Sequence, residues 1–131
     1  MNIFTDGGSR GNPGPSGAGG VIFNQLGEVV AEISEYLGIQ TNNYAEYQGL
    51  ILTLQRAIEL GIDEVSVFMD SKLIVEQING KWKVKSVTLR PLYNTVVGLL
   101  PNFKKITFKH IYRHLNKHAD GLVNKILDKY K

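Results

Sequence analysis

Residues 43–70, NYAEYQGLILTLQRAIELGIDEVSVFMD, predict a helix that is followed at once by a short buried strand. Apolar residues recur at helical spacing from Tyr47 to Ile58, and Gly61 is the kind of residue that ends a helix. Val65–Met69 is an apolar run with β-branched residues, which is long enough for one strand. A helical crossover between strands is right-handed, so we expect this strand to lie parallel to an earlier one.

The rest of the chain supplies the partners of that strand. Residues 1–6 predict a first strand, and a Gly- and Pro-rich loop is expected from Gly7 to Gly20. The other expected elements are strands at 21–23, 28–36 and 105–112, and helices at 71–78, 88–98 and 115–130, with Asn42 or Asn43 capping the helix at 43–60. This order predicts an α/β fold: three antiparallel strands, then parallel strands, in one mixed sheet with helices packed on it.

Composition agrees with one folded domain over residues 1–131, because 43% of the residues are apolar and 21% are charged. No apolar run nears the roughly 18 residues that span a membrane. No leader pattern opens the chain, so we expect a cytoplasmic protein. No cysteine occurs, which excludes disulfides and cysteine–zinc sites. Residues 1–65 hold two basic and eight acidic residues, whereas residues 66–131 hold thirteen basic and four acidic. This division suggests a polyanionic partner, a metal site, or both.

Four carboxylates are candidates for that metal site. Asp6 and Asp70 each follow an apolar run, and the two runs are expected to be neighbouring parallel strands whose carboxyl ends meet at one edge. Glu46, in the first turn of helix 43–60, and Asp120, near the start of the last helix, add two more. Oxygen ligands favour Mg²⁺ or Mn²⁺, and a pair of such ions supports phosphodiester displacement. Taken singly, each acid can instead be a turn former, a helix cap such as Asp70, or a partner of the helix dipole such as Glu46.

Four stretches of the chain, in order, carry a resemblance to a known family. They are IFTDGGSRGNPGPSG (residues 3–17), TNNYAE (41–46), MDS (69–71) and RHLNKHAD (113–120). The chain resembles type 1 ribonuclease H, in a short form that lacks a basic insertion after the third stretch. The resemblance implies a ribonuclease H-like five-stranded mixed sheet with helices on both faces. It also implies endonucleolytic cleavage of the RNA strand of RNA–DNA hybrids with two Mg²⁺ ions, for which Mn²⁺ could substitute.

The resemblance also implies roles for individual residues. By motif position, the catalytic metal ligands are Asp6, Glu46, Asp70 and Asp120. The substrate-binding candidates are Gly7, Gly8, Ser9, Asn12, Thr41, Asn42, Asn43, Ser71 and Arg113. Among them, Thr41 falls where the family touches a DNA-strand phosphate, and Ser9 and the asparagines fall near the ribose 2′-hydroxyls. Amide side chains both donate and accept hydrogen bonds, which suits a 2′-hydroxyl, and glycines let the backbone approach the nucleic acid closely.

Three features depart from the family pattern. Where a basic insertion is common in the family, this chain has only the short stretch KWKVK (Lys81–Lys85). This stretch either grips a DNA backbone or is a solvated loop with a packing Trp. We expect weaker substrate affinity than in relatives that carry the insertion. The stretch before Asp120 is short, so either His114 or His118 is a candidate proton shuttle and Arg113 an alternative phosphate contact. Gly121 follows Asp120 inside a predicted helix, where glycine costs about 1 kcal/mol relative to alanine.

Our interpretation is a monomeric, metal-dependent endoribonuclease whose partner is an RNA–DNA hybrid and not a membrane. One alternative is a catalytically weak or inactive module of the same fold that binds hybrid or double-stranded RNA. Another is an exonuclease or junction resolvase of the same broad fold, which the Thr41–Asn43 amides disfavour because they suit a ribose. A metabolic enzyme acting on a small phosphate ester has no matching motif.

Overall fold

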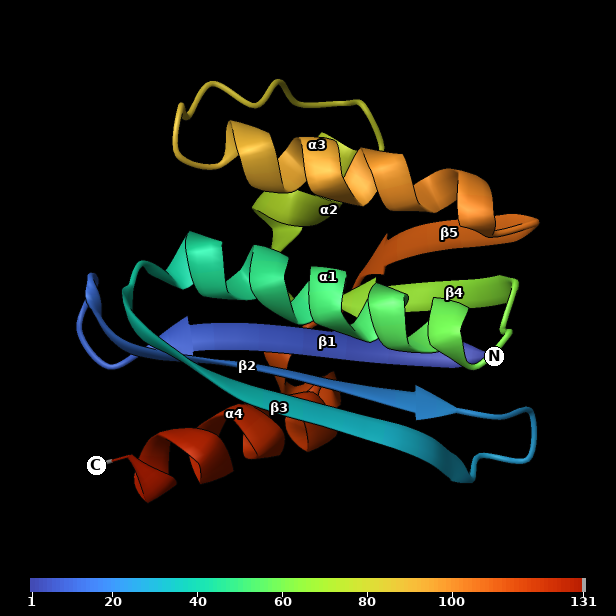
Figure 1. Ribbon diagram of the computed structural model, residues 1–131, viewed down its shortest axis with the longest axis horizontal. Helices are drawn as coiled ribbons and strands as arrows, with labels where there is room; N and C mark the ends of the chain where they lie inside the picture. Colours follow the sequence, from blue (N-terminus) through green and yellow to red (C-terminus); the bar gives the residue numbers. More distant parts are fainter. Residues whose placement is uncertain (131) are drawn as a thin grey trace.

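The computed structural model describes residues 1–130, and its centre is one five-stranded sheet (Figure 1). The strands are β1 (Asn2–Ser9), β2 (Gly14–Phe23), β3 (Val29–Gln40), β4 (Glu64–Met69) and β5 (Lys105–His110). Their spatial order is β3-β2-β1-β4-β5. The pairs β1–β2 and β2–β3 are antiparallel, whereas β1–β4 and β4–β5 are parallel. The predicted mixed sheet is therefore confirmed, including the parallel crossover through the first helix.

Four α-helices within residues 1–130 pack on the sheet or on one another. They are α1 (Asn42–Glu59), α2 (Lys72–Ile78), α3 (Arg90–Leu99) and α4 (Lys117–Lys129). The helix α1 lies along one face and α4 along the opposite face, so both faces are covered, as Figure 1 shows. The helix α3 packs against α1, and α2 packs against β5. No helix within residues 1–130 is long and apolar enough to cross a membrane.

The prediction of a loop from Gly7 to Gly20 was wrong. β1 continues to Ser9 and β2 begins at Gly14, and the two pair in register from Asn2–Phe23 to Ser9–Ser16. Only residues 10–13 connect them. The glycines that suggested a loop are needed because helices lie close on both faces of these strands.

Contacts of individual glycines show this crowding. A Cβ at Gly20 would overlap the Thr53 side chain of α1. On the other face, a Cβ at Gly19 would lie 2.9 Å from the Ala119 carbonyl oxygen of α4. Side chains at these positions would hold both helices away from the sheet. The glycine-rich composition therefore records tight packing rather than chain flexibility.

Several predicted boundaries also shifted. β3 extends to Gln40 rather than 36, because a register irregularity near Ser16–Gly17 and a positive φ at Gly38 let the pairing continue. The helix α1 begins at Asn42, and its N-cap is Thr41, whose Oγ1 accepts from the Tyr44 backbone N–H at 3.2 Å. Glu46 therefore lies past the first turn, not within it. β5 ends at His110, and a 3-10 turn at Arg113–Leu115 precedes α4.

The hydrophobic core lies between α1 and the sheet. Ile3 of β1 and Val67 of β4 face Leu50 and Leu54 of α1, and all four are fully buried. Tyr47 is buried with them and its hydroxyl donates to Gln77 Oε1 of α2 at 2.5 Å. This core fixes α1 against the central strands, and so it fixes the position of Glu46, which is on the same helix.

Candidate active site

Asp6 and Asp70 lie side by side because of the register between β1 and β4. The last parallel pair is Thr5–Met69, so the next residue on each strand is an aspartate. β1 continues past this point along β2, and β4 ends here. Asp6 is therefore not at the end of its strand, contrary to prediction, but it is where the parallel pairing ends. Asp70 is not a helix cap, because Ser71 caps α2 by accepting from the Ile74 backbone N–H at 3.4 Å.

Glu46 joins them because β1 and α1 touch through their backbones. A Cβ at Gly7 would overlap the carbonyl group of Ala45, and a Cβ at Gly49 would overlap the carbonyl oxygen of Asp6. Two glycines, one on each element, thus allow the strand and the helix to come together beside Asp6. Glu46 projects from the helix at this contact.

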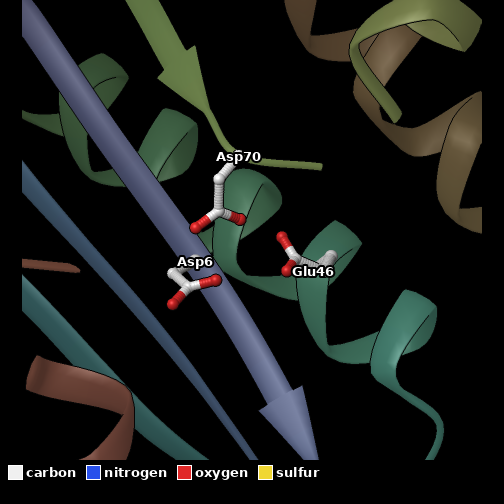
Figure 2. A group of neighbouring side chains, drawn as sticks. All are labelled: Asp6, Glu46 and Asp70. Atoms are coloured by element: carbon white, nitrogen blue, oxygen red, sulfur yellow. The ribbon is translucent and has the colours of Figure 1, made fainter. Parts of the chain in front are cut away.

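The three carboxylates converge, as Figure 2 shows. One oxygen from each of Asp6, Glu46 and Asp70 lies within 4.8 Å of the others. They line a cleft of about 430 Å³. Three separate elements of the chain therefore direct acidic oxygens to one point.

Burial raises the pKa of all three carboxyls. Burial, and then the charge of Asp70, raises the pKa of Asp6 from 3.8 to about 7. The pKa of Glu46 is raised well above its ordinary value, first by burial and then by the charges of Asp6 and Asp70. The pKa of Asp70 is also raised by burial, against the hydrogen bond from Asn116, which lowers it. Three such groups resist ionising together, and a cation among them would remove that repulsion.

The donor set fits a hard divalent cation. Carboxylate oxygens converge in this group, and the Glu46 Oε2 is buried without a hydrogen-bond partner among residues 1–130. A buried carboxylate oxygen without a partner is costly unless an ion or water satisfies it. Oxygen-only sites favour Mg²⁺ or Mn²⁺ over softer metals. The predicted metal chemistry thus agrees with the atoms that this cleft presents.

Asp120 stands at the rim of the cleft and outside the group of three. It is in the first turn of α4, with 32% of its side chain exposed. Its Oδ1 is 3.9 Å from Arg113 Nη2, and its Oδ2 accepts from Asn124 Nδ2 at 3.3 Å. Asp120 lines the same cleft as the other acids, but its oxygens are not among those that converge. Its place as a fourth ligand therefore stays a prediction.

Most of the residues predicted to bind substrate line the same cleft. The predicted residues that line it are Gly7, Gly8, Ser9, Asn42, Asn43, Ser71 and Arg113. The Ser9 backbone N–H and hydroxyl both donate to Asn42 Oδ1, at 2.8 and 3.1 Å. Asn12 does not line the cleft, but its Oδ1 accepts from the Asn42 backbone N–H at 3.0 Å. Thr41 serves as the cap of α1. A fixed network therefore orients the Asn42 amide beside the carboxylates.

The two histidines occupy different places. His114 lies in an open hollow with Tyr112, Arg113, Lys117 and Asp120. His118 faces the other way: its Nε2 is 2.5 Å from Glu32 Oε2 of β3. His118 is thus held on the sheet side of α4 and does not line the cleft. Of the two candidates for a proton shuttle, only His114 lines a hollow together with Asp120.

A family model described as reverse transcriptase-like matches residues 4–126. This chain belongs to the reverse transcriptase-like family. A bifunctional protein of Mycobacterium tuberculosis is 46% identical over 127 residues, which are 96% of this chain and 35% of that protein. A ribonuclease HI of Halobacterium salinarum is 38% identical over 128 residues, which are 98% of this chain and 64% of that protein. The chain thus spans between about a third and two thirds of the length of these relatives.

Solved structures agree with the family. The crystal structure of the Halobacterium salinarum RNase H1 has a TM-score of 0.94 and 38% identity, covering 98% of this chain and 97% of that one. LC11-RNase H1, solved in complex with an RNA/DNA hybrid, has a TM-score of 0.92 and 43% identity, with the same coverage. The fold of this reverse transcriptase-like chain is therefore that of ribonuclease H, and the resemblance read from its sequence is confirmed.

Sequence reasoning missed several residues of this ribonuclease H-like cleft. Arg10, Val123, Asn124 and Leu127 also line it. Val123, Asn124 and Leu127 follow Asp120 by three, four and seven residues, so helical spacing alone could have placed them on the same face of α4. The side chain of Arg10 is held by an ion pair, with its Nη2 2.7 Å from Asp128 Oδ1. No sequence pattern indicates this pair.

Proposed function

We propose that this chain is a monomeric endonuclease that hydrolyses the RNA strand of RNA–DNA hybrids by a two-metal-ion mechanism. The observation that carries the proposal is the convergence of Asp6, Glu46 and Asp70, with oxygens within 4.8 Å of one another, in a cleft lined by donor groups. The likeness to LC11-RNase H1, which was solved with an RNA/DNA hybrid, supports the same class of substrate.

Recognition of the RNA strand falls to the network around Asn42. Ser9 donates two hydrogen bonds to the side-chain oxygen of Asn42, Oδ1. The side-chain NH₂ group of Asn42 is therefore the part that would donate to substrate. A ribose 2′-hydroxyl accepts such a hydrogen bond, and a deoxyribose lacks the 2′-hydroxyl. This contact would distinguish the RNA strand from DNA next to the carboxylates.

The carboxylates would hold the metal ions that bind the reacting phosphate. Asp6, Glu46 and Asp70 would bind two Mg²⁺ ions, with Asp120 completing the set. When bound, the ions supply charge neutralisation, activation of water and stabilisation of the leaving 3′ oxygen. Hydrolysis there would form a bond from the water oxygen to phosphorus and break the bond from phosphorus to the 3′ oxygen. A proton from the water would pass to the 3′ oxygen, leaving a 3′-hydroxyl and a 5′-phosphate. Arg113, whose side chain is 84% exposed beside Asp120, would pair with a phosphate oxygen.

The DNA strand would lie over the basic stretch between α2 and α3. Lys81, Lys83 and Lys85 are exposed there, and Trp82 between them is 44% exposed. Arg90 ties this stretch to α3 by donating from Nη1 to the Val84 carbonyl oxygen at 3.0 Å. Lysines here would neutralise DNA phosphates, so affinity should fall with salt.

The test compares the wild-type chain with Asp70→Asn on an end-labelled RNA–DNA hybrid, in Mg²⁺, Mn²⁺ or EDTA. We expect internal cuts in the RNA that need the metal and disappear in Asp70→Asn. Asp63→Asn is the matched control, because Asp63 is an exposed aspartate that lies outside the cleft. It should cleave as the wild type does.

Substrate controls separate the alternatives. Double-stranded RNA, double-stranded DNA and single strands should remain intact. Hybrid that is bound but never cut would instead indicate a binding module. Cutting that starts only from strand ends, or that attacks DNA junctions, would indicate a different nuclease of this fold.

A further inference from the structure

Asn116 stands at the start of α4 but does not behave as a helix cap. Asparagine is among the best N-cap residues, because its side-chain oxygen accepts from a backbone N–H of the first turn. Here the Asn116 side chain makes no such bond. It is turned inward and is 1% exposed. The residue thus gives up its usual local role for a place inside the molecule.

Inside, its amide group joins two acid-bearing strands. The Asn116 Nδ2 donates to the Thr5 carbonyl oxygen at 2.9 Å and to the Asp70 Oδ2 at 3.4 Å. Thr5 directly precedes Asp6 on β1, and Asp70 directly follows β4. One NH₂ group therefore spans the point where the parallel pairing of these strands ends.

The backbone of Asn116 reaches the fourth acid. Its carbonyl oxygen accepts from the Asp120 backbone N–H at 3.1 Å, which is the first helical bond of α4. Asn116 therefore contacts Asp70 with its side chain and Asp120 with its main chain, and it is bonded to the residue before Asp6. Among the described residues, Asn116 thus connects the neighbourhoods of three predicted ligands, Asp6, Asp70 and Asp120, through its side chain and its carbonyl group.

The arrangement carries a local cost. The Asn116 Oδ1 is buried and has no hydrogen-bond partner within residues 1–130. An unpaired buried oxygen and a forgone cap both destabilise the fold. Departures from local rules such as these concentrate at functional sites, where another requirement overrides stability.

We propose that Asn116 is a positioning residue for the metal-binding carboxylates, setting the orientation of Asp70 and the distance of Asp120 from it. The inference rests on the proposed nuclease function. The amide donor holds one oxygen of Asp70, Oδ2, and the backbone of Asn116 begins α4, whose first turn carries Asp120. Partners of this kind around metal ligands typically change metal affinity or activity by about 10–100-fold when removed.

Asn116→Ser tests this role while protecting the fold. Serine restores an N-cap side chain, and its hydroxyl is too short to span Thr5 and Asp70. Asn79→Ser is the matched control, because the Asn79 Nδ2 also donates to a strand carbonyl oxygen, that of Phe108 at 3.1 Å, and neither residue lines the cleft. Both variants lose an amide-to-carbonyl bond, but only one loses a bond to a carboxylate.

The main measurement is Mg²⁺ binding by calorimetry without substrate. We expect Asn116→Ser to bind Mg²⁺ about tenfold more weakly than the wild type, and Asn79→Ser to bind it equally well. Turnover should fall in Asn116→Ser and partly recover at high Mg²⁺, whereas affinity for hybrid in EDTA stays unchanged. Mg²⁺ affinity and turnover within twofold of the wild type in folded Asn116→Ser would overturn the proposal.

Two further results keep the outcomes distinct. If Asn116→Ser does not fold, the side-chain amide signal of Asn116 in the wild type is followed by NMR during Mg²⁺ titration. A shift of that signal at the Mg²⁺ concentration that saturates the site supports the proposal, and an unmoved signal overturns it. If the wild type does not cleave hybrid, the nuclease function fails, but the Mg²⁺ comparison still decides the role of Asn116.

Discussion

Gly49 of α1 lies directly against the carbonyl oxygen of Asp6, with no room for a side chain between them. The same helix carries Glu46 one turn earlier. The distance between two of the proposed metal ligands is thus set by a backbone-to-backbone contact between a strand and a helix. Glycine is needed on the helix because any Cβ there would separate the two elements.

Gly49→Ala should therefore damage the site more than the fold. The added methyl group forces α1 away from β1, at a cost of about 1–3 kcal/mol in the free energy of unfolding. Urea denaturation measures that cost, and Mg²⁺ calorimetry measures the site. We expect Mg²⁺ affinity to fall well beyond what partial unfolding explains. Gly98→Ala in α3 is the control, since a Cβ there meets nothing within 4 Å, and an equal loss of Mg²⁺ affinity in it would contradict the expectation.

Gly121→Ala should stabilise the protein. Gly121 lies inside α4 without a positive φ, and a Cβ there meets nothing within 4 Å. Replacing a helical glycine by alanine gains about 1 kcal/mol. We expect a higher urea midpoint with cleavage retained. Stabilisation accompanied by loss of cleavage would show instead that Asp120 needs a flexible helix start.

The stability of the metal-free protein should fall as pH rises toward neutrality. The pKa of Asp6 is raised to about 7 in the folded state from 3.8, so between these values the folded state holds a proton that the unfolded chain has released. The folded state binds more protons there, so the free energy of unfolding decreases with rising pH. Burial and the nearby acids raise the pKa values of Glu46 and Asp70 as well, which adds in the same direction.

Asp6→Asn measures that effect. Because it removes one of the acids, we expect its advantage in melting temperature over the wild type, without metal, to be larger at pH 8 than at pH 5. Added Mg²⁺ should raise the melting temperature of the wild type most at pH 8. An advantage that does not change with pH would mean that Asp6 ionises with an ordinary pKa.

The two histidines should differ in their effect on turnover. His118 pairs with Glu32 away from the cleft, so His118→Ala should change turnover by less than about twofold and cost about 0–1 kcal/mol of stability. His114→Ala should lower turnover if its imidazole transfers protons near Asp120. The pH profile of turnover on hybrid distinguishes them. Loss of turnover in His118→Ala alone would reverse the assignment.

Much of the fold could be predicted from periodicity and order alone. The helical repeat from Tyr47 to Ile58 and the apolar run at Val65–Met69 each reflect burial within a single element, which a sequence pattern records directly. The chirality of the crossover then placed the two strands in parallel. The glycine-rich run at 7–20 was misread, because glycine marks both turns and tight packing, and the pattern does not distinguish them.

The sequence by itself determined which acids could meet, since Asp6 and Asp70 each follow the apolar run of a parallel strand. Only the tertiary structure decided how they meet. Glu46 reaches them through the close contact of Gly7 and Gly49 with neighbouring backbone, and Asn116 turns inward rather than capping its helix. Such features depend on the register and separation of elements distant in the chain, and local periodicity carries no record of those distances.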